Sequence, residues 1–248
     1  PGYIAARRLT KRAGWLPAGA REMMALRQGR YWVGRKARAS LMDAFSAAGF
    51  TFARASQASR SNAAGLLVYE ADGAPRLDYH PATLAPLGLL LERAMTPLIA
   101  NGEALDNAYW TKNLCAVSPN QDAAPDGTAT GDRMIPNATT SSGIRISNAT
   151  VVTLTSGTRY ALSGFAKPDG AFGVPHVTFG FDYSVLWHAG WYSLQQRAAG
   201  VVQQGGPSPQ TMVREGGNGW LRCLFSHVTT ATAQRVGVAP SASNQSRP

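Results

Sequence analysis

Short runs of alternating apolar and polar residues fill the second half of the chain. In Tyr160-Ala-Leu-Ser-Gly-Phe-Ala166 every second residue falls on one face, the period of two that a half-buried strand requires. Turn residues separate these runs, as in Pro125-Asp-Gly127 and Gly216-Gly-Asn-Gly219. Strands are predicted at residues 112–119, 132–135, 143–152, 159–167, 176–183, 199–203, 211–215, 220–228 and 234–238. The regular spacing predicts a β-sandwich from Trp110 onward.

The pattern before Trp110 is different. Residues 21–30 and 40–48 predict two short helices, with Ser40 as a candidate N-cap and Gly49 following the second helix. Residues 50–100 predict extended chain with one strand at 66–69, because prolines at 75, 81, 86 and 97 exclude a long helix. We therefore expect three parts: a basic, partly helical arm at 1–49, an extended packing segment at 50–109, and the sandwich at 110–248.

The positive charge of the chain is concentrated in the arm. The first forty residues hold ten Lys/Arg and one acid, a net charge of +9, whereas the other 208 hold 14 basic and 13 acidic residues. Three interpretations fit this composition: docking into an acidic surface of a larger particle, a solvated tail, and nucleic-acid binding helped by Tyr31 and Trp32. Docking is favoured and nucleic acid is not. The anchoring candidates are Arg7, Arg8, Lys11, Arg12, Arg27, Arg30, Arg35, Lys36 and Arg38.

Composition narrows the class of protein. The 26 glycines and 15 prolines fit a turn-rich β protein, and 44% hydrophobic residues can fill a core. Cys115 and Cys223 have no metal-ligand spacing, so we expect two small buried side chains. No apolar run reaches the length of a membrane span, and we expect a soluble protein without a membrane partner.

Residue patterns for catalysis or metal binding are weak. The chain has no G-x-S-x-G elbow and no phosphate loop, and its four histidines lack the i, i+4 spacing of a zinc site. Asp122, Asp126 and Asp132 lie near one another and could act as a glycosidase pair or hold a structural calcium ion. Because Asp126 is a turn residue and the other two flank loops, we expect no enzyme and no cofactor, with structural calcium as the remaining alternative.

The richest aromatic cluster runs from Phe179 to Tyr192. Alternation places Phe179, Phe181 and Tyr183 on one inward face, whereas the residues around Gly190 predict a loop or strand end. Exposed rings there could stack on a sugar, and buried ones would pack in the core or between subunits. The carbohydrate-binding candidates are Trp187, His188, Trp191, Tyr192 and Asp182. Trp220, which opens a strand after a glycine-rich turn, is expected in the core.

Several short sequence strings follow one another in a distinctive order along the chain. They are Phe50-Thr-Phe-Ala-Arg-Ala-Ser56, Arg76-Leu-Asp-Tyr79, Gly88-Leu-Leu-Leu-Glu92, Trp110-Thr-Lys112, Pro125-Asp-Gly-Thr128, Gly157-Thr-Arg-Tyr160 and Gly217-Asn-Gly-Trp-Leu-Arg222. Together they resemble the head-spike or tail-fibre domain family of tailed phages and gene transfer agents, over residues 50–225. The chain departs from that pattern at Thr96-Pro-Leu-Ile99, and it lacks the closing Trp-Gly-Ala-Gln strand. A neighbour could supply this strand, the edge could stay open, or the chain could be truncated.

The resemblance implies a jelly roll similar to carbohydrate-binding modules, mounted on a virion and facing the host. We therefore expect a virion structural protein that contacts capsid or appendage proteins and attaches the particle to host surface polysaccharide. Because virion appendages are symmetric, a homo-oligomer is expected, a trimer in a fibre or a pentamer at a capsid vertex. The alternatives are a polysaccharide-degrading spike and a capsid decoration protein without glycan binding.

Overall fold

The structure is a computed structural model that describes residues 49, 51–92, 96–137, 144–169, 176–183, 186–203 and 208–241. Strands hold 52% of these residues and none lies in an α-helix, so the prediction of a mostly β protein is confirmed. In this part of the chain, no helix has the length and apolar character needed to cross a membrane. The helices predicted in the arm and its anchoring residues lie outside the described residues.

The described residues form two compact units. The N-terminal unit contains residues up to 64 together with 68–92, and the C-terminal unit contains 65–67 together with residues from 96 onward. Ile99, Leu105 and Tyr109 pack against the core of the C-terminal unit. The residues just before Trp110, which were expected in the extended packing segment, therefore fold with the sheets that follow them.

Two small hairpins make up the N-terminal unit. β1 (Ala58–Ser61) pairs with β2 (Leu67–Glu70), and β3 (Leu77–Tyr79) pairs with β4 (Pro86–Leu89). Only the strand at 66–69 was predicted. The others are three or four residues long, too short for periodicity to distinguish them from irregular chain.

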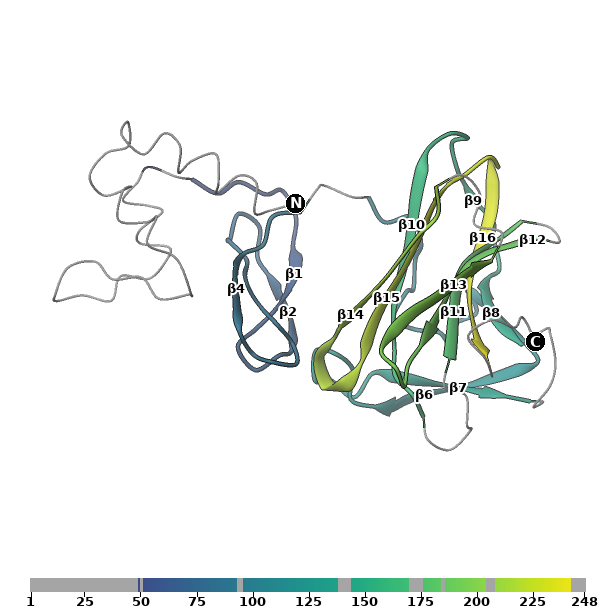
Figure 1. Cartoon of the computed structure of the whole chain (residues 1–248), viewed down its shortest axis with the longest axis horizontal. Coiled ribbons are helices and arrows are strands. Elements are labelled where there is room, and N and C mark those ends of the chain that lie inside the picture. Colours follow the sequence, from purple (N-terminus) through teal and green to yellow (C-terminus); the bar gives the residue numbers. More distant parts are fainter. Residues whose placement is uncertain are drawn as a thin grey trace, which may run out of the picture. The chain divides into compact units, whose positions relative to one another are not determined.

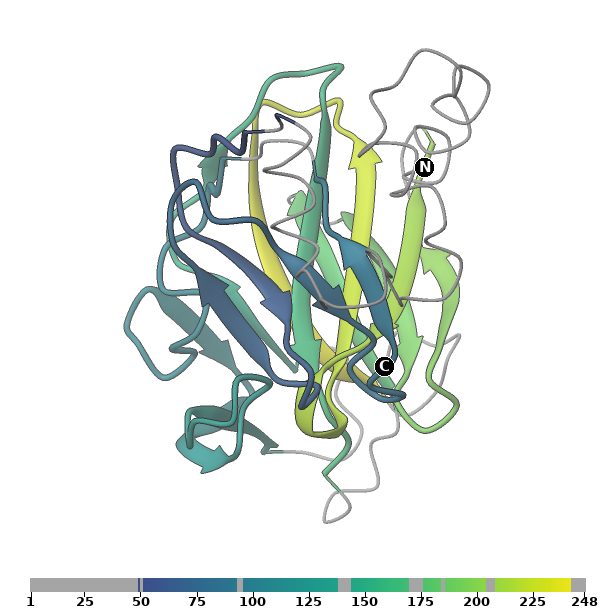
Figure 2. The same cartoon turned by 90° about the vertical axis from the view of Figure 1, so that its left-hand side faces the viewer.

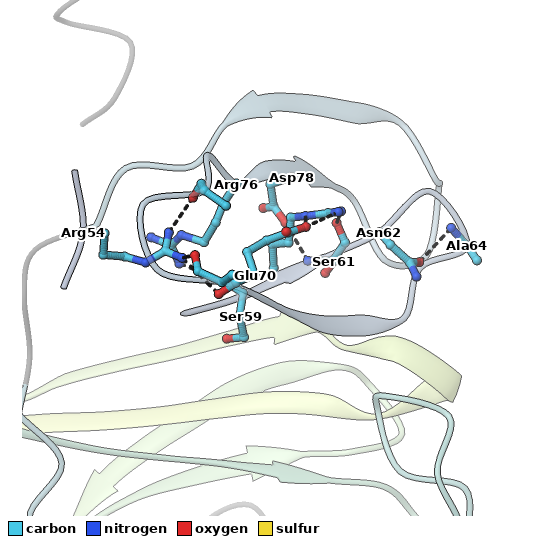
Figure 3. Close-up of polar contacts among 11 residues, drawn as sticks. Arg54, Ser59, Ser61, Asn62, Ala64, Glu70, Arg76 and Asp78 are labelled. Atoms are coloured by element: carbon cyan, nitrogen blue, oxygen red, sulfur yellow. Dashed lines mark hydrogen bonds and ion pairs between the residues drawn. The ribbon is translucent and has the colours of Figure 1, made fainter. Parts of the chain in front are cut away.

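Charged side chains hold these hairpins together (Figure 3). The Arg54 guanidinium donates hydrogen bonds to the carbonyl oxygens of Glu70 (3.0 Å) and Ala74 (2.8 Å). Arg76 is buried and donates to the carbonyl of Ser59 (2.9 Å) and the carboxylate of Glu92 (2.7 Å). Arg54, Arg76 and Glu92, one residue from each of the first three strings, thus make polar contacts inside this unit, and their role there is structural.

Replacing Arg76 tests this network. In Arg76→Met the apolar stem stays, but the Ser59 carbonyl and Glu92 lose their donor, which should destabilise the unit by about 1–3 kcal/mol. Hydrogen exchange of the β1 and β3 amides measures this loss. The exposed Arg222→Met is the matched control, and equal protection in both variants would contradict the assignment.

The C-terminal unit contains two larger antiparallel sheets and a hairpin (Figures 1 and 2). The seven-stranded sheet has the order β13-β12-β11-β16-β8-β5, with β9 also paired to β16. Its strands are β5 (Trp110–Asn113), β8 (Arg145–Asn148), β9 (Val152–Thr153), β11 (His176–Tyr183), β12 (Leu186–Ser193), β13 (Ala198–Gln203) and β16 (Ala233–Ser241). The three-stranded sheet has the order β10-β15-β14, from β10 (Arg159–Ala166), β14 (Gln210–Glu215) and β15 (Leu221–Val228). A separate hairpin joins β6 (Cys115–Asp122) to β7 (Gly131–Pro136).

The predicted strand at 112–119 is two strands in the structure. Leu114 has φ of +52°, a left-handed conformation that interrupts the extended backbone between β5 and β6. The chain therefore leaves the seven-stranded sheet after β5 and enters the β6–β7 hairpin. A non-glycine residue with positive φ gives no sequence signal, so this break was missed.

The core lies between the two large sheets. Phe181 on β11 and Phe225 on β15 have ring centroids 6.0 Å apart, and Phe179 and Tyr192 are equally close. The predicted inward face of β11 is therefore confirmed for Phe179 and Phe181. Cys115 and Cys223 are free and buried, as predicted, and burial raises the pKa of the Cys223 thiol to about 12.

Gly164 on β10 allows the sheets to approach closely. A Cβ at this position would lie 2.5 Å from Cε1 of Phe179, and so the ring occupies the space of the missing side chain. This contact confirms the predicted inward face of β10.

We expect Gly164→Ala to destabilise the protein by about 1–3 kcal/mol, because the added methyl overpacks the buried Phe179 ring. The shift of the urea unfolding midpoint measures this effect. Gly102→Ala is the control, since a Cβ at Gly102 meets nothing within 4 Å. An unchanged midpoint in Gly164→Ala would show that the sheets do not depend on this contact.

His227 is a titratable group inside the core. Its ring lies 4.8 Å from Phe181 and 5.2 Å from His188, measured between centroids. Burial, with the nearby His188 and Arg159, lowers the pKa of His227 to about 4. The folded chain therefore keeps this imidazole neutral at pH values where the unfolded chain protonates it.

This difference makes stability depend on pH. The contribution of His227 is complete above its ordinary pKa of 6.5 and is lost as pH falls toward 4, by up to about 3 kcal/mol. His227→Phe should flatten the dependence of the free energy of unfolding on pH, measured by urea unfolding between pH 7.5 and 4. A slope equal to that of the wild-type protein would assign the acid sensitivity to other groups.

Candidate binding pocket

The aromatic cluster predicted to bind sugar lies largely inside the C-terminal unit. Trp191 is 3% exposed and Tyr192 is fully buried, with its hydroxyl donating to the Leu224 carbonyl. His188 is half-buried, and its ring stacks on His227. The expectation of a loop around Gly190 is wrong, because β12 continues through it. For Asp182 and Trp187 only the backbone is described, paired with each other between β11 and β12.

The reason for this difference is the position of β12 within its sheet. It pairs with β11 on one side and β13 on the other, and its residues 189–193 are all buried, so neither face of this stretch is exposed. Gly190 lies where a Cβ would come within 2.6 Å of the Thr211 side chain and 2.7 Å of the Tyr192 hydroxyl. The glycine therefore permits close packing and does not mark a turn.

A pocket of about 520 Å³ lies elsewhere in the C-terminal unit, beside β10. The consecutive residues 162–169, from β10 and the chain after it, all line this pocket. Consecutive residues of a strand point to opposite faces, so the edge of β10 itself borders the cavity. In the described part of the chain β10 pairs only with β15, which leaves that edge available. The β6–β7 hairpin contributes the facing wall.

The inner part of the pocket is apolar. Leu162, Val177, Phe179 and Val238 contribute to its walls, and these side chains also belong to or pack on the hydrophobic core. The floor is therefore fixed by the same packing that holds the sheets together.

Aromatic rings stand nearer the mouth. Trp220 is half-buried, and its indole N–H donates to the Ala123 carbonyl at 2.8 Å. Gly131 makes room for the ring, since a Cβ there would lie 2.9 Å from Cζ2 of Trp220. Phe165, also half-buried, lines the same pocket. Trp220 was expected in the core, whereas the structure places it at the boundary between core and pocket.

Two ion pairs connect the walls of the pocket. Lys167 Nζ lies 2.8 Å from a carboxylate oxygen of Asp122, and Arg133 Nε lies 3.0 Å from one of Asp169. The hydrogen bond from Lys167 lowers the pKa of Asp122 below its ordinary value. The Asp132 carboxylate accepts the backbone N–H groups of Leu105 (2.8 Å) and Asn120 (3.1 Å).

The two aspartates with shifted pKa values do not match the acid of a glycosidase. A glycosidase needs one carboxylic acid that keeps its proton near neutral pH, which requires a raised pKa. Asp122 is shifted in the opposite direction, and Asp126 is also lowered, by hydrogen bonds from Thr128 in its turn. Within the described ranges, no group of three or more His, Cys, Asp or Glu side chains could hold a metal ion.

Sequence reasoning named Asp122 and Asp132 together but did not connect them with Trp220. Lys167, Arg133 and Phe165 were not considered as site residues. These side chains come from β6, β7, the end of β10 with the residue after it, and the residue before β15, and nothing in their spacing along the chain predicts that they meet. In comparisons with known proteins, no family model and no curated protein matches the chain.

Proposed function

We propose that this protein is a structural component of a phage or gene-transfer-agent particle, in a head spike or tail fibre. Its C-terminal unit is a jelly-roll β-sandwich that attaches the particle to polysaccharide on the host surface. The basic arm docks the chain on capsid or appendage proteins, and the assembled protein is a symmetric homo-oligomer on the virion surface. The protein is not an enzyme and needs no cofactor.

The observation that carries the binding role is the pocket beside β10. It combines a half-buried tryptophan, an apolar floor and a rim of charged side chains. The apolar face of a sugar stacks on aromatic rings. Its hydroxyl groups donate hydrogen bonds to carboxylates. The volume of about 520 Å³ lies within the range of sites that hold small ligands.

The short sequence strings that resemble the head-spike or tail-fibre family support the proposal that this protein is part of a particle. Those in the N-terminal unit supply Arg54, Arg76 and Glu92, whose polar contacts hold its segments together. Gly217 to Arg222 includes Trp220 at the pocket. The strings thus fall on residues with structural or pocket-lining positions, as a shared fold would require. A polysaccharide-degrading spike is disfavoured by the lowered pKa of Asp122.

Incubation of the full chain with immobilised host capsular polysaccharide tests this function. We expect the protein to be retained and the length of soluble polysaccharide chains, measured by size-exclusion chromatography, to stay unchanged. Shortening of the polysaccharide would establish the degrading spike instead. If none of the host surface polysaccharides retains the protein, the decoration role without glycan binding replaces this proposal.

A further inference from the structure

The charges around the pocket restrict the kind of sugar it can accept. Three carboxylates line it, from Asp122, Asp132 and Asp169, against the two basic side chains of Arg133 and Lys167. Both basic side chains already pair with carboxylates, at 3.0 and 2.8 Å. An anionic sugar would have to displace one of these partners and would meet the displaced carboxylate nearby, which is unfavourable.

A neutral sugar meets no such conflict. Its hydroxyl groups can donate to the remaining lone pairs of Asp122 without breaking the ion pair to Lys167, because a carboxylate has about four acceptor positions. Asp122 is about half exposed at its side chain, so these positions are accessible. The edge of β10 that is unpaired among the described residues adds backbone donors and acceptors along the same wall.

Trp220 is placed to bind the apolar face of such a sugar. Its N–H is occupied by the Ala123 carbonyl, which fixes one edge of the indole, and Gly131 packs against the ring. A ring that is held in place before binding loses little conformational entropy when a ligand stacks on it. Phe165 extends the aromatic lining on the β10 side.

We propose that the pocket beside β10 binds a neutral saccharide, with Trp220 stacking on the sugar and the Asp122–Lys167 pair excluding anionic sugars. This proposal rests on the proposed function, since it names the site and the ligand class of the attachment protein. Asp122 is then a specificity-determining residue: it accepts sugar hydroxyls and keeps Lys167 neutralised.

The test is a glycan array that holds neutral bacterial oligosaccharides and matched oligosaccharides carrying glucuronic acid, probed with the full chain. We expect wild-type protein to bind neutral members and Trp220→Ala to weaken this binding at least tenfold. Asp122→Asn should weaken neutral binding several-fold and raise binding of the glucuronic acid series, because Lys167 loses its partner. This reversal is a readout that general destabilisation would not produce.

Matched controls separate folding from binding. Asp106→Asn removes an exposed carboxylate outside the pocket, and Val201→Ala truncates an exposed side chain on β13. Both should bind like wild type. Trp220→Phe keeps a stacking ring and should retain more binding than Trp220→Ala, while urea unfolding midpoints report on stability.

The outcomes distinguish this inference from the function on which it rests. Binding of acidic sugars alone overturns the neutral-saccharide assignment and leaves glycan attachment standing. Neutral binding that survives both pocket variants places the site elsewhere. Absence of any glycan binding overturns both proposals. Co-purification of an extended peptide that protects the β10 amides from hydrogen exchange would show that the pocket accepts an added strand and not a sugar.

Discussion

The packing of the Phe179 ring against Gly164 sets the distance between β10 and the seven-stranded sheet. Because Gly164 has no side chain, β10 can lie close to β11 while its outer edge remains unpaired in the described structure. Leu162 and Phe179 then serve two purposes, since they pack with the core and also form the floor of the pocket. The position of the candidate site therefore follows from core packing between two strands. Trp220 and Phe165 line the same pocket nearer to solvent.

The two units use different means of stabilisation. The C-terminal unit buries aromatic and aliphatic side chains between its sheets, with Phe181 and Phe225 at the centre of one cluster. The N-terminal unit relies on guanidinium groups that donate hydrogen bonds to backbone carbonyls and carboxylates. One of these groups, that of Arg76, is buried. Short hairpins cannot build a large apolar core, so hydrogen bonds from Arg54 and Arg76 replace part of it.

The bounds of several strands were predictable from the sequence, and those of two other segments were not. β10, β11 and β15 lie close to their predicted bounds; exposure alternates over the first six residues of β10, whereas residues 177–181 of β11 are buried on both faces. β12 was missed because it is interior and contains Gly190, which resembled a break. The division between β5 and β6 depends on the positive φ of Leu114. The pocket was beyond sequence reasoning for a different reason: Asp122, Lys167 and Trp220 come together only through strand order, which local patterns do not specify.

A crystal structure of the full chain soaked with a neutral oligosaccharide selected on the array tests the central claim most directly. The account predicts a sugar ring stacked on Trp220, a hydroxyl group within hydrogen-bond distance of the Asp122 carboxylate, and an intact Asp122–Lys167 ion pair. A saccharide bound at another surface, with the pocket beside β10 empty or filled by polypeptide, would contradict it.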